Sequence, residues 1–87
     1  MDEQIRKIAD HYGLENQKIK LSEECAELIQ ALLKNNDENH IIEEISDVEI
    51  VLEQVKYKMK CTNAVEFVKK SKINRQLNRI VREKKHE

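Results

Sequence analysis

Two pairs of acidic residues are spaced so that each pair lies on one face of a helix. Glu24 and Glu27 form the first pair, and Glu44 and Asp47 form the second. Residues three apart on an α-helix point in nearly the same direction, so each pair can aim two carboxylates at one point. Acidic runs on exposed helix faces are common, and the spacing alone favours that simpler interpretation.

The helical wheel places one of these carboxylates among apolar side chains. With about 100° per residue, three valines of the same segment fall within roughly 40° of Glu44. Glu24 borders the apolar arc of its own segment. Buried carboxylates are costly unless they are paired, and converging ones repel one another. A divalent cation between the two segments would remove this conflict, with Glu24, Glu27, Glu44 and Asp47 as ligands.

The type of ligand selects the ion. Oxygen donors suit Mg²⁺, Mn²⁺ or Ca²⁺, and no cluster of Cys and His offers a zinc site. Mg²⁺ binds few protein carboxylates and leaves positions for water or phosphate, so we expect Mg²⁺, with Mn²⁺ as an alternative. An iron–carboxylate bundle would need two Glu-x-x-His pairs on core helices, whereas Glu83 and His86 stand alone. Glu49 also falls near the apolar side of its wheel, and its role stays open.

The end of the chain is basic, whereas the rest is acidic. Residues 1–67 carry 8 Lys and Arg against 15 Asp and Glu, a net charge of −7, and residues 68–87 carry 8 against 2, which is +6. A stripe within about 80° of the wheel contains Lys72, Arg75, Arg79 and Arg82. Such a stripe can bind phosphate oxygens. The alternatives are a solvated helix end or nucleic-acid contact, but the acidic remainder and few aromatics argue against nucleic acid.

The elements that must position these residues are all helical. Apolar residues recur at helical spacing without β-type alternation, so we predict an all-α fold of four helices. The expected segments are 2–12, 15–34, 38–59 and a fourth that frays at 83–87. Gly13 ends the first helix, Asp37 caps the third after a turn at 35–37, and Thr62 or Asn63, which has capping-box spacing to Glu66, caps the fourth. Short connections favour an antiparallel helical bundle.

The chain has few large apolar side chains with which one protomer could form its own hydrophobic core. Its 87 residues form a single domain, 1–87, with no Trp, one Phe and 38% charged residues. Chains this short often need a partner, so we expect self-association to complete the bundle. With two Cys, no secretory signal and no apolar stretch of about 18 residues, we expect a cytoplasmic protein that does not contact a membrane.

The two acidic motifs and the basic segment resemble those of the MazG-like, all-α nucleoside triphosphate pyrophosphohydrolases, in particular the short phage and bacterial type. The mark of that family is E-E-x-x-E followed, after a helix–turn–helix gap, by E-x-x-D. Here these motifs are Glu23, Glu24 and Glu27, then Glu44 and Asp47. The segment Lys72-x-x-Arg75-x-x-x-Arg79 resembles the basic final helix of the family, and the resemblance covers nearly the whole chain.

The resemblance implies an enzyme that hydrolyses a nucleoside triphosphate between the α- and β-phosphates, giving a monophosphate and pyrophosphate. It implies Mg²⁺ ligands at Glu24, Glu27, Glu44 and Asp47, with Glu23 added as a catalytic position. The implied substrate-binding residues are Lys72, Arg75 and Arg79, with Gln17 and Lys20 as weaker candidates. Dimers or tetramers with sites between helices are also implied.

Two alternatives stay open. Phosphoribosyl-ATP pyrophosphohydrolase has similar size and motifs, and a non-catalytic helical interaction or regulatory module would keep the bundle without turnover. The sequence names neither the base nor the sugar, and it does not give the number of metal ions per site.

Overall fold

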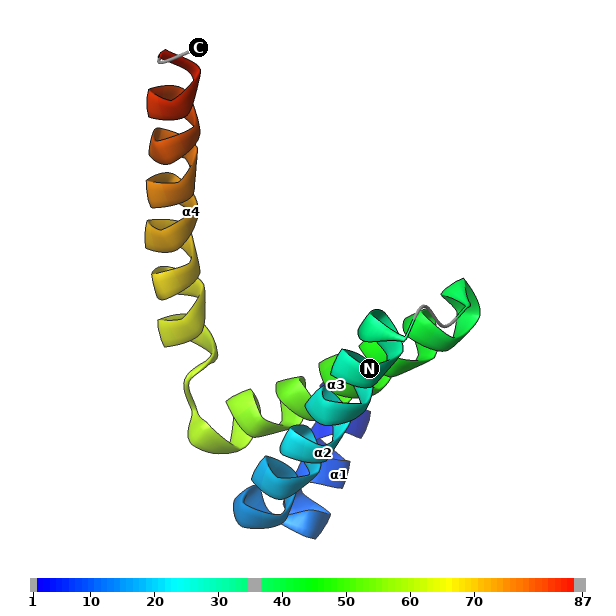
Figure 1. Cartoon of the computed structure of the whole chain (residues 1–87). Coiled ribbons are helices and arrows are strands. Elements are labelled where there is room, and N and C mark those ends of the chain that lie inside the picture. The colour runs from blue at the N-terminus through cyan, green and yellow to red at the C-terminus, as the bar shows by residue number, and fades with distance from the viewer. Residues whose placement is uncertain (1, 35–36, 86–87) are drawn as a thin grey trace.

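The computed structural model describes residues 2–34 and 37–85, and every element within these ranges is a helix. The helices are α1 (Asp2–Tyr12), α2 (Leu14–Leu33), α3 (Glu38–Met59) and α4 (Thr62–Lys85), as Figure 1 shows. The predicted all-α fold is confirmed. The first and third helices have the predicted bounds, and the second is displaced by one residue at each end. Among these four helices, none has the length and apolar character needed to cross a membrane.

The ends of the first three helices follow from local chemistry. Gly13 separates α1 from α2 and has a φ of 86°, a left-handed conformation that glycine adopts without a Cβ penalty. Its N–H still donates to the carbonyl of Ala9 at 2.8 Å, so α1 is capped as it ends. Asp37 caps α3 as predicted, because its side chain accepts a hydrogen bond of 3.0 Å from the N–H of His40. The rest of the turn predicted at 35–37 lies outside the described residues.

Helices α1, α2 and α3 pack together around a small interior. Helices α2 and α3 run side by side in opposite directions, and α1 lies mainly against α3 (Figure 1). The buried apolar residues in the described ranges are Ala9, Ala31, Val51 and Val55. All four are small, which agrees with the thin core expected from the composition. A side-chain hydrogen bond from Gln17 Nε2 to Gln54 Oε1 joins α2 to α3 inside this core.

Helix α4 leaves this packed unit. Lys60 ends α3 in the left-handed conformation, with φ 56° and ψ 39°. The N–H of Cys61 donates to the carbonyl of Lys56, and that of Lys60 donates to Tyr57, both at 3.1 Å. These two bonds form a Schellman motif, in which a non-glycine residue carries the strained position. None of the described residues of α4 is buried.

The protomer is therefore extended, and the prediction of an antiparallel bundle holds for α1–α3 but is wrong for α4. The Cα radius of gyration is 16.6 Å, whereas a compact chain of this length would have about 12 Å. The short α3–α4 connection sets only how near the helix ends lie, and the direction of α4 follows from the turn at Lys60. Helix α4 continues to Lys85, so the predicted fraying from Glu83 is also wrong within the described residues.

The predicted cap of α4 needs a correction of one residue. The carbonyl of Cys61 already accepts a hydrogen bond of 2.8 Å from the N–H of Val65, and the helix begins at Thr62. Cys61 thus occupies the N-cap position. Thr62 and Asn63 both lie inside the first turn, where neither can act as the cap.

Candidate metal centre

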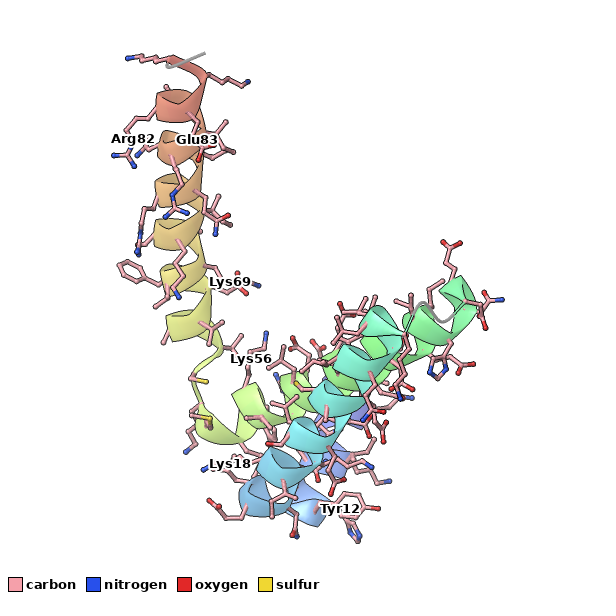
Figure 2. All side chains as sticks on the ribbon, viewed as in Figure 1. Tyr12, Lys18, Lys56, Lys69, Arg82 and Glu83 are labelled. Carbon is pink, nitrogen blue, oxygen red and sulfur yellow. The ribbon has the colours of Figure 1, made fainter. Side chains whose placement is uncertain are left out.

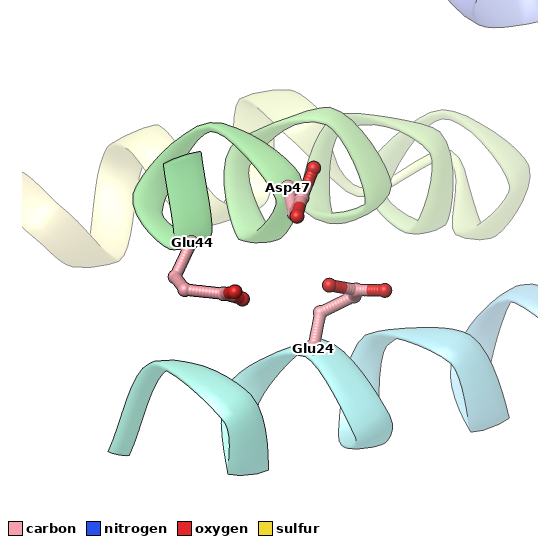
Figure 3. A group of neighbouring side chains, drawn as sticks. All are labelled: Glu24, Glu44 and Asp47. Carbon is pink, nitrogen blue, oxygen red and sulfur yellow. The ribbon is translucent and has the colours of Figure 1, made fainter. Parts of the chain in front are cut away.

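Glu24, Glu44 and Asp47 point into one space between α2 and α3, as Figure 3 shows. Helix α2 supplies Glu24, and α3 supplies the other two residues from adjacent turns. One carboxylate oxygen from each residue lies within 4.8 Å of those from the other two. The packing of the two helices therefore brings together three of the four metal ligands expected from the sequence.

Two of these carboxylates are withdrawn from water. The side chain of Glu24 is 8% exposed and that of Glu44 is 12% exposed, whereas Asp47 is exposed. The positions of Glu24 and Glu44 near the apolar arcs of their helices anticipated this burial. In both residues Oε2 is fully buried and has no hydrogen-bond partner in the described part of the chain. A buried oxygen without a partner is costly, and a cation between the helices would satisfy both.

The other oxygen of each buried carboxylate has a basic neighbour. Lys20 Nζ lies 3.1 Å from Glu24 Oε1 and 4.0 Å from Glu23 Oε2. The hydrogen bond to Glu24 is the main reason that the pKa of Lys20 is raised. His40 Nε2 lies 3.8 Å from Glu44 Oε1. Both basic groups lie at Oε1, so Oε2 of Glu24 and of Glu44 is the oxygen without a hydrogen-bond partner among the described residues.

Glu27 lies beside the group of three rather than within it. It is exposed, and the group of carboxylate oxygens within 4.8 Å of one another does not include it. The negative charge of Glu24 raises the pKa of Glu27, with further contributions from desolvation and from Glu44. Glu27 therefore lies in the field of the same carboxylates, and a cation near them would relieve the repulsion.

The separations of the oxygens suit an octahedral ion after a small adjustment. Mg²⁺ with Mg–O bonds of about 2.1 Å places neighbouring ligand oxygens about 3.0 Å apart and opposite ones about 4.2 Å apart. The three oxygens lie within 4.8 Å of one another, so they would have to move closer together to bind such an ion. Three carboxylates from two helices, all with oxygen donors, thus fit a hard divalent cation.

The remaining candidates on α2 lie near this centre. Lys20 contacts Glu24 directly, and Glu23 is exposed next to Lys20. Gln17 is buried two turns earlier on α2, where it donates its hydrogen bond to Gln54. The structure therefore places Lys20 and Glu23 beside Glu24, and Gln17 two turns away inside the core.

The basic candidates on α4 are not brought to the acidic group within one protomer. Lys72, Arg75 and Arg79 are exposed on a helix that stands apart from α2 and the start of α3. Figure 2 shows side chains projecting on all sides of α4, with Lys69 and Arg82 labelled. Within the described part of the protomer, the basic stripe and the acidic group therefore stand apart.

Two loose ends of the sequence are placed only in part. Glu49 is exposed in the protomer, although the wheel placed it near the apolar side of α3. Glu83 is exposed at the end of α4, and its possible partner His86 lies outside the described residues.

Sequence reasoning missed two residues that the structure places near the centre. Gln54 lies seven residues after Asp47, a spacing that puts both on nearly the same face of α3. His40 lies four residues before Glu44, the spacing of side-chain pairs on a helix. Both signals are present in the sequence, but neither distinguishes these residues from many other polar residues at the same spacings.

Comparison of the chain with protein-family models, with curated proteins and with solved structures found no match.

Proposed function

We propose that the protein is a Mg²⁺-dependent nucleotide pyrophosphohydrolase that adds water across the α–β phosphoanhydride of a nucleoside triphosphate. The main support is that one carboxylate oxygen each of Glu24, Glu44 and Asp47 converge, and that Oε2 of Glu24 and of Glu44 is buried without a hydrogen-bond partner among the described residues. The order and spacing of the acidic motifs, which resemble those of MazG-like enzymes, supply the reaction.

In this mechanism the buried carboxylates of Glu24 and Glu44, together with Asp47, would hold Mg²⁺. The bound ion would supply charge for the phosphate oxygens and polarise the attacking water. Glu27 stands at the edge of the group with an exposed carboxylate, and it would serve as the base that takes a proton from water there. The products are a nucleoside monophosphate and pyrophosphate, and water is the only co-reactant.

We also propose that the working enzyme is a homodimer or homotetramer, because the protomer leaves apolar stripes uncovered. Ile45, Leu52 and Met59 recur at seven-residue spacing on α3, and they are 41%, 38% and 53% exposed. Ile73 and Ile80 have the same spacing on α4 and are 53% and 46% exposed. Seven-residue spacing is the pattern by which helices pack against partner helices.

The charges of the two regions favour a particular assembly. The segment with the acidic centre is negative and α4 is positive, so α4 of one copy is attracted to the acidic helices of another. Lys72, Arg75 and Arg79 would then reach the phosphates bound at the centre of the neighbouring copy. Arg suits this task because its guanidinium can bind two phosphate oxygens at once.

The direct test is pyrophosphate release from a panel of ribo- and deoxyribonucleoside triphosphates, and from phosphoribosyl-ATP, with Mg²⁺ or Mn²⁺. Glu44→Gln removes one charge at nearly constant shape, and we expect turnover to fall by about 100-fold or more with helicity retained. Glu43→Gln is the matched control, because Glu43 is its exposed neighbour on α3.

Three outcomes would contradict the proposal. Equal turnover by the two variants would remove Glu44 from the site. Preference for phosphoribosyl-ATP over every ordinary nucleotide would select the alternative substrate. No release of pyrophosphate from any substrate would favour a non-catalytic helical module.

A further inference from the structure

A cavity of about 490 Å³ lies among α1, α2 and α3, next to the acidic centre. Its apolar wall includes Ile8, Tyr12, Ile19 and Ile50, which are 41%, 54%, 62% and 45% exposed. Its volume falls in the range of small-molecule sites, which are mostly apolar with a few fixed polar groups. This cavity is therefore large enough and apolar enough for an aromatic ring.

The polar groups of this cavity are an amide pair that the rest of the core would not require. Gln17 is 6% exposed and Gln54 is 2% exposed, and both line the cavity. The hydrogen bond between them uses one donor of Gln17 and the oxygen of Gln54. This hydrogen bond leaves the carbonyl oxygen of Gln17 as an acceptor and the amino group of Gln54 as a donor. Such a mixed edge is complementary to the hydrogen-bonding edge of a nucleobase.

The position of the amide pair along the helices matches the order of groups in a nucleotide. Gln17 precedes Glu24 by seven residues, or about 10 Å along α2, and Gln54 follows Asp47 by the same distance along α3. Lys20 lies between these levels, with Nζ 3.1 Å from Glu24 Oε1, and it also lines the cavity. In this order the Gln17–Gln54 pair would lie at the base, Lys20 at the phosphates and the acidic centre at the metal ion.

We propose that this cavity binds the nucleobase of the substrate, with Tyr12 packing on the ring and the Gln17–Gln54 pair recognising its edge. The inference rests on the proposed function for the identity of the acidic centre. It adds the place where the base binds and the residues that recognise it. In this arrangement Lys20 lies where the chain of phosphates leaves the sugar, and it directs them toward Glu24.

The test compares kcat/KM for nucleoside triphosphates with kcat/KM for inorganic tripolyphosphate, which has no base. Tyr12→Ala should lower kcat/KM for nucleotides by about 10-fold, the scale of a lost base–aromatic contact, and leave tripolyphosphate unchanged. Phe67→Ala is the matched control, because Phe67 is an aromatic residue on α4 that is 72% exposed. If Tyr12 had only a structural role, Tyr12→Ala would lower kcat/KM for nucleotides and for tripolyphosphate together.

A second variant tests recognition of the base edge. Gln54→Glu keeps an oxygen that accepts the hydrogen bond of Gln17 but replaces the amino group with an acceptor. We expect the order of preference among the bases to change, while tripolyphosphate again reports any general effect of the added charge. An unchanged order among the bases would remove the amide pair from recognition.

Titration with adenosine, guanosine, cytidine, uridine and thymidine, without metal, separates this inference from the proposed function. Nucleoside binding that Tyr12→Ala weakens would support the cavity even if no nucleotide were hydrolysed. If tripolyphosphate and nucleotides were hydrolysed equally well and Tyr12→Ala had no effect, the cavity would be excluded and the enzyme retained. No nucleoside binding together with no hydrolysis would exclude both.

Discussion

The unit of α1–α3 and the single helix α4 differ in charge, burial and dependence on a partner. The first unit carries the acidic centre and buries Gln17, Glu24 and Gln54. A side-chain hydrogen bond between Gln17 and Gln54 joins two of its helices. Helix α4 carries the basic stripe, and none of its described residues is buried. One region thus has the architecture of a site, whereas the other presents charges and apolar residues without a surface to pack against.

This difference indicates how function is divided along the chain. The acidic centre forms within one protomer because its three carboxylates lie on two helices that pack together. The basic stripe lies on α4, which does not pack against these helices within the described part of the protomer. An isolated helix of this length draws most of its stability from packing, so α4 is expected to be completed by a second copy.

The largest expected effect comes from separating these regions into different chains. One chain would carry Glu44→Gln, and the other Lys72→Gln, Arg75→Gln and Arg79→Gln, each alone with about 1% of wild-type activity or less. If α4 acts on a neighbouring copy, mixing the two restores about a quarter of the activity in a randomly assembled dimer. Pyrophosphate release after co-refolding measures this recovery. No recovery would mean that α4 serves its own chain or no site.

The control for that experiment removes two positive charges of α4 that lie outside the stripe, against three in the stripe variant. Lys70 and Lys84 lie away from the stripe on the wheel, and Lys70→Gln with Lys84→Gln should leave most of the activity. A loss as large as that of the stripe variant would show that net charge, rather than the stripe, matters.

The next largest effect is on the free energy of unfolding, because the three carboxylates of the acidic centre repel one another. In metal-free buffer, Glu44→Gln should raise the free energy of unfolding by about 1 kcal/mol, because it removes one of three converging charges. Added Mg²⁺ should stabilise the wild type and not the variant, since only the wild type gains binding energy. Denaturant unfolding with and without Mg²⁺ measures both. An equal response from Glu43→Gln and Glu44→Gln would contradict the account.

The stability of the packed unit should depend on pH, because Asp10 of α1 contacts two side chains of α3. Lys58 Nζ and Tyr57 Oη each lie 3.1 Å from a different oxygen of Asp10. The hydrogen bond from Lys58 is the main cause that lowers the pKa of Asp10. The ionised Asp10 therefore stabilises the fold at pH values above the ordinary pKa of an aspartate. This stabilisation is lost as the pH falls through the lower pKa that Asp10 has in the folded state.

Thermal melts should therefore show wild type above Asp10→Asn at pH 7, and this difference should shrink as the pH falls below the ordinary pKa of an aspartate. Asp2→Asn provides a control at an exposed carboxylate of the same helix. A constant difference across this range would mean that the ionised form of Asp10 is not what joins the helices.

The smallest effect lies at the junction of the two regions. Lys60→Gly should stabilise the fold by about 0.5–1 kcal/mol, because glycine adopts the left-handed conformation without strain. Lys34→Gly is the control, since Lys34 also ends a helix but has a φ of −94°. Chemical denaturation of both variants measures the contrast. A gain at Lys34 as large as that at Lys60 would show that the gain does not come from left-handed geometry.

Sequence periodicity predicted the helices well because their ends carry local signals. Gly13 and Asp37 each act through their own backbone or side chain, and both were identified. The burial of Glu24 and Glu44 followed from the wheel, since an apolar arc packs inward wherever it finds a partner. The direction of α4 could not be predicted, because it depends on a left-handed Lys60, which the sequence does not mark.

The site was predictable only where one helix face determined it. The i, i+3 spacing placed Glu24 with Glu27 and Glu44 with Asp47, but the register between α2 and α3 decides which oxygens converge. That register brings Asp47 into the group and leaves Glu27 at its edge. The pairing of Gln17 with Gln54 depends on the same register, so it was visible only in three dimensions.

Calorimetric titration of the metal-free protein with Mn²⁺ and with Mg²⁺ tests directly whether a metal ion binds between α2 and α3. We predict saturable binding by the wild type and by the exposed controls Glu23→Gln and Glu43→Gln. Binding should be lost in Glu24→Gln, Glu44→Gln and Asp47→Asn, with the helical content of each unchanged by circular dichroism. Equal binding by all five variants, or no binding by the wild type, would contradict a metal centre between α2 and α3.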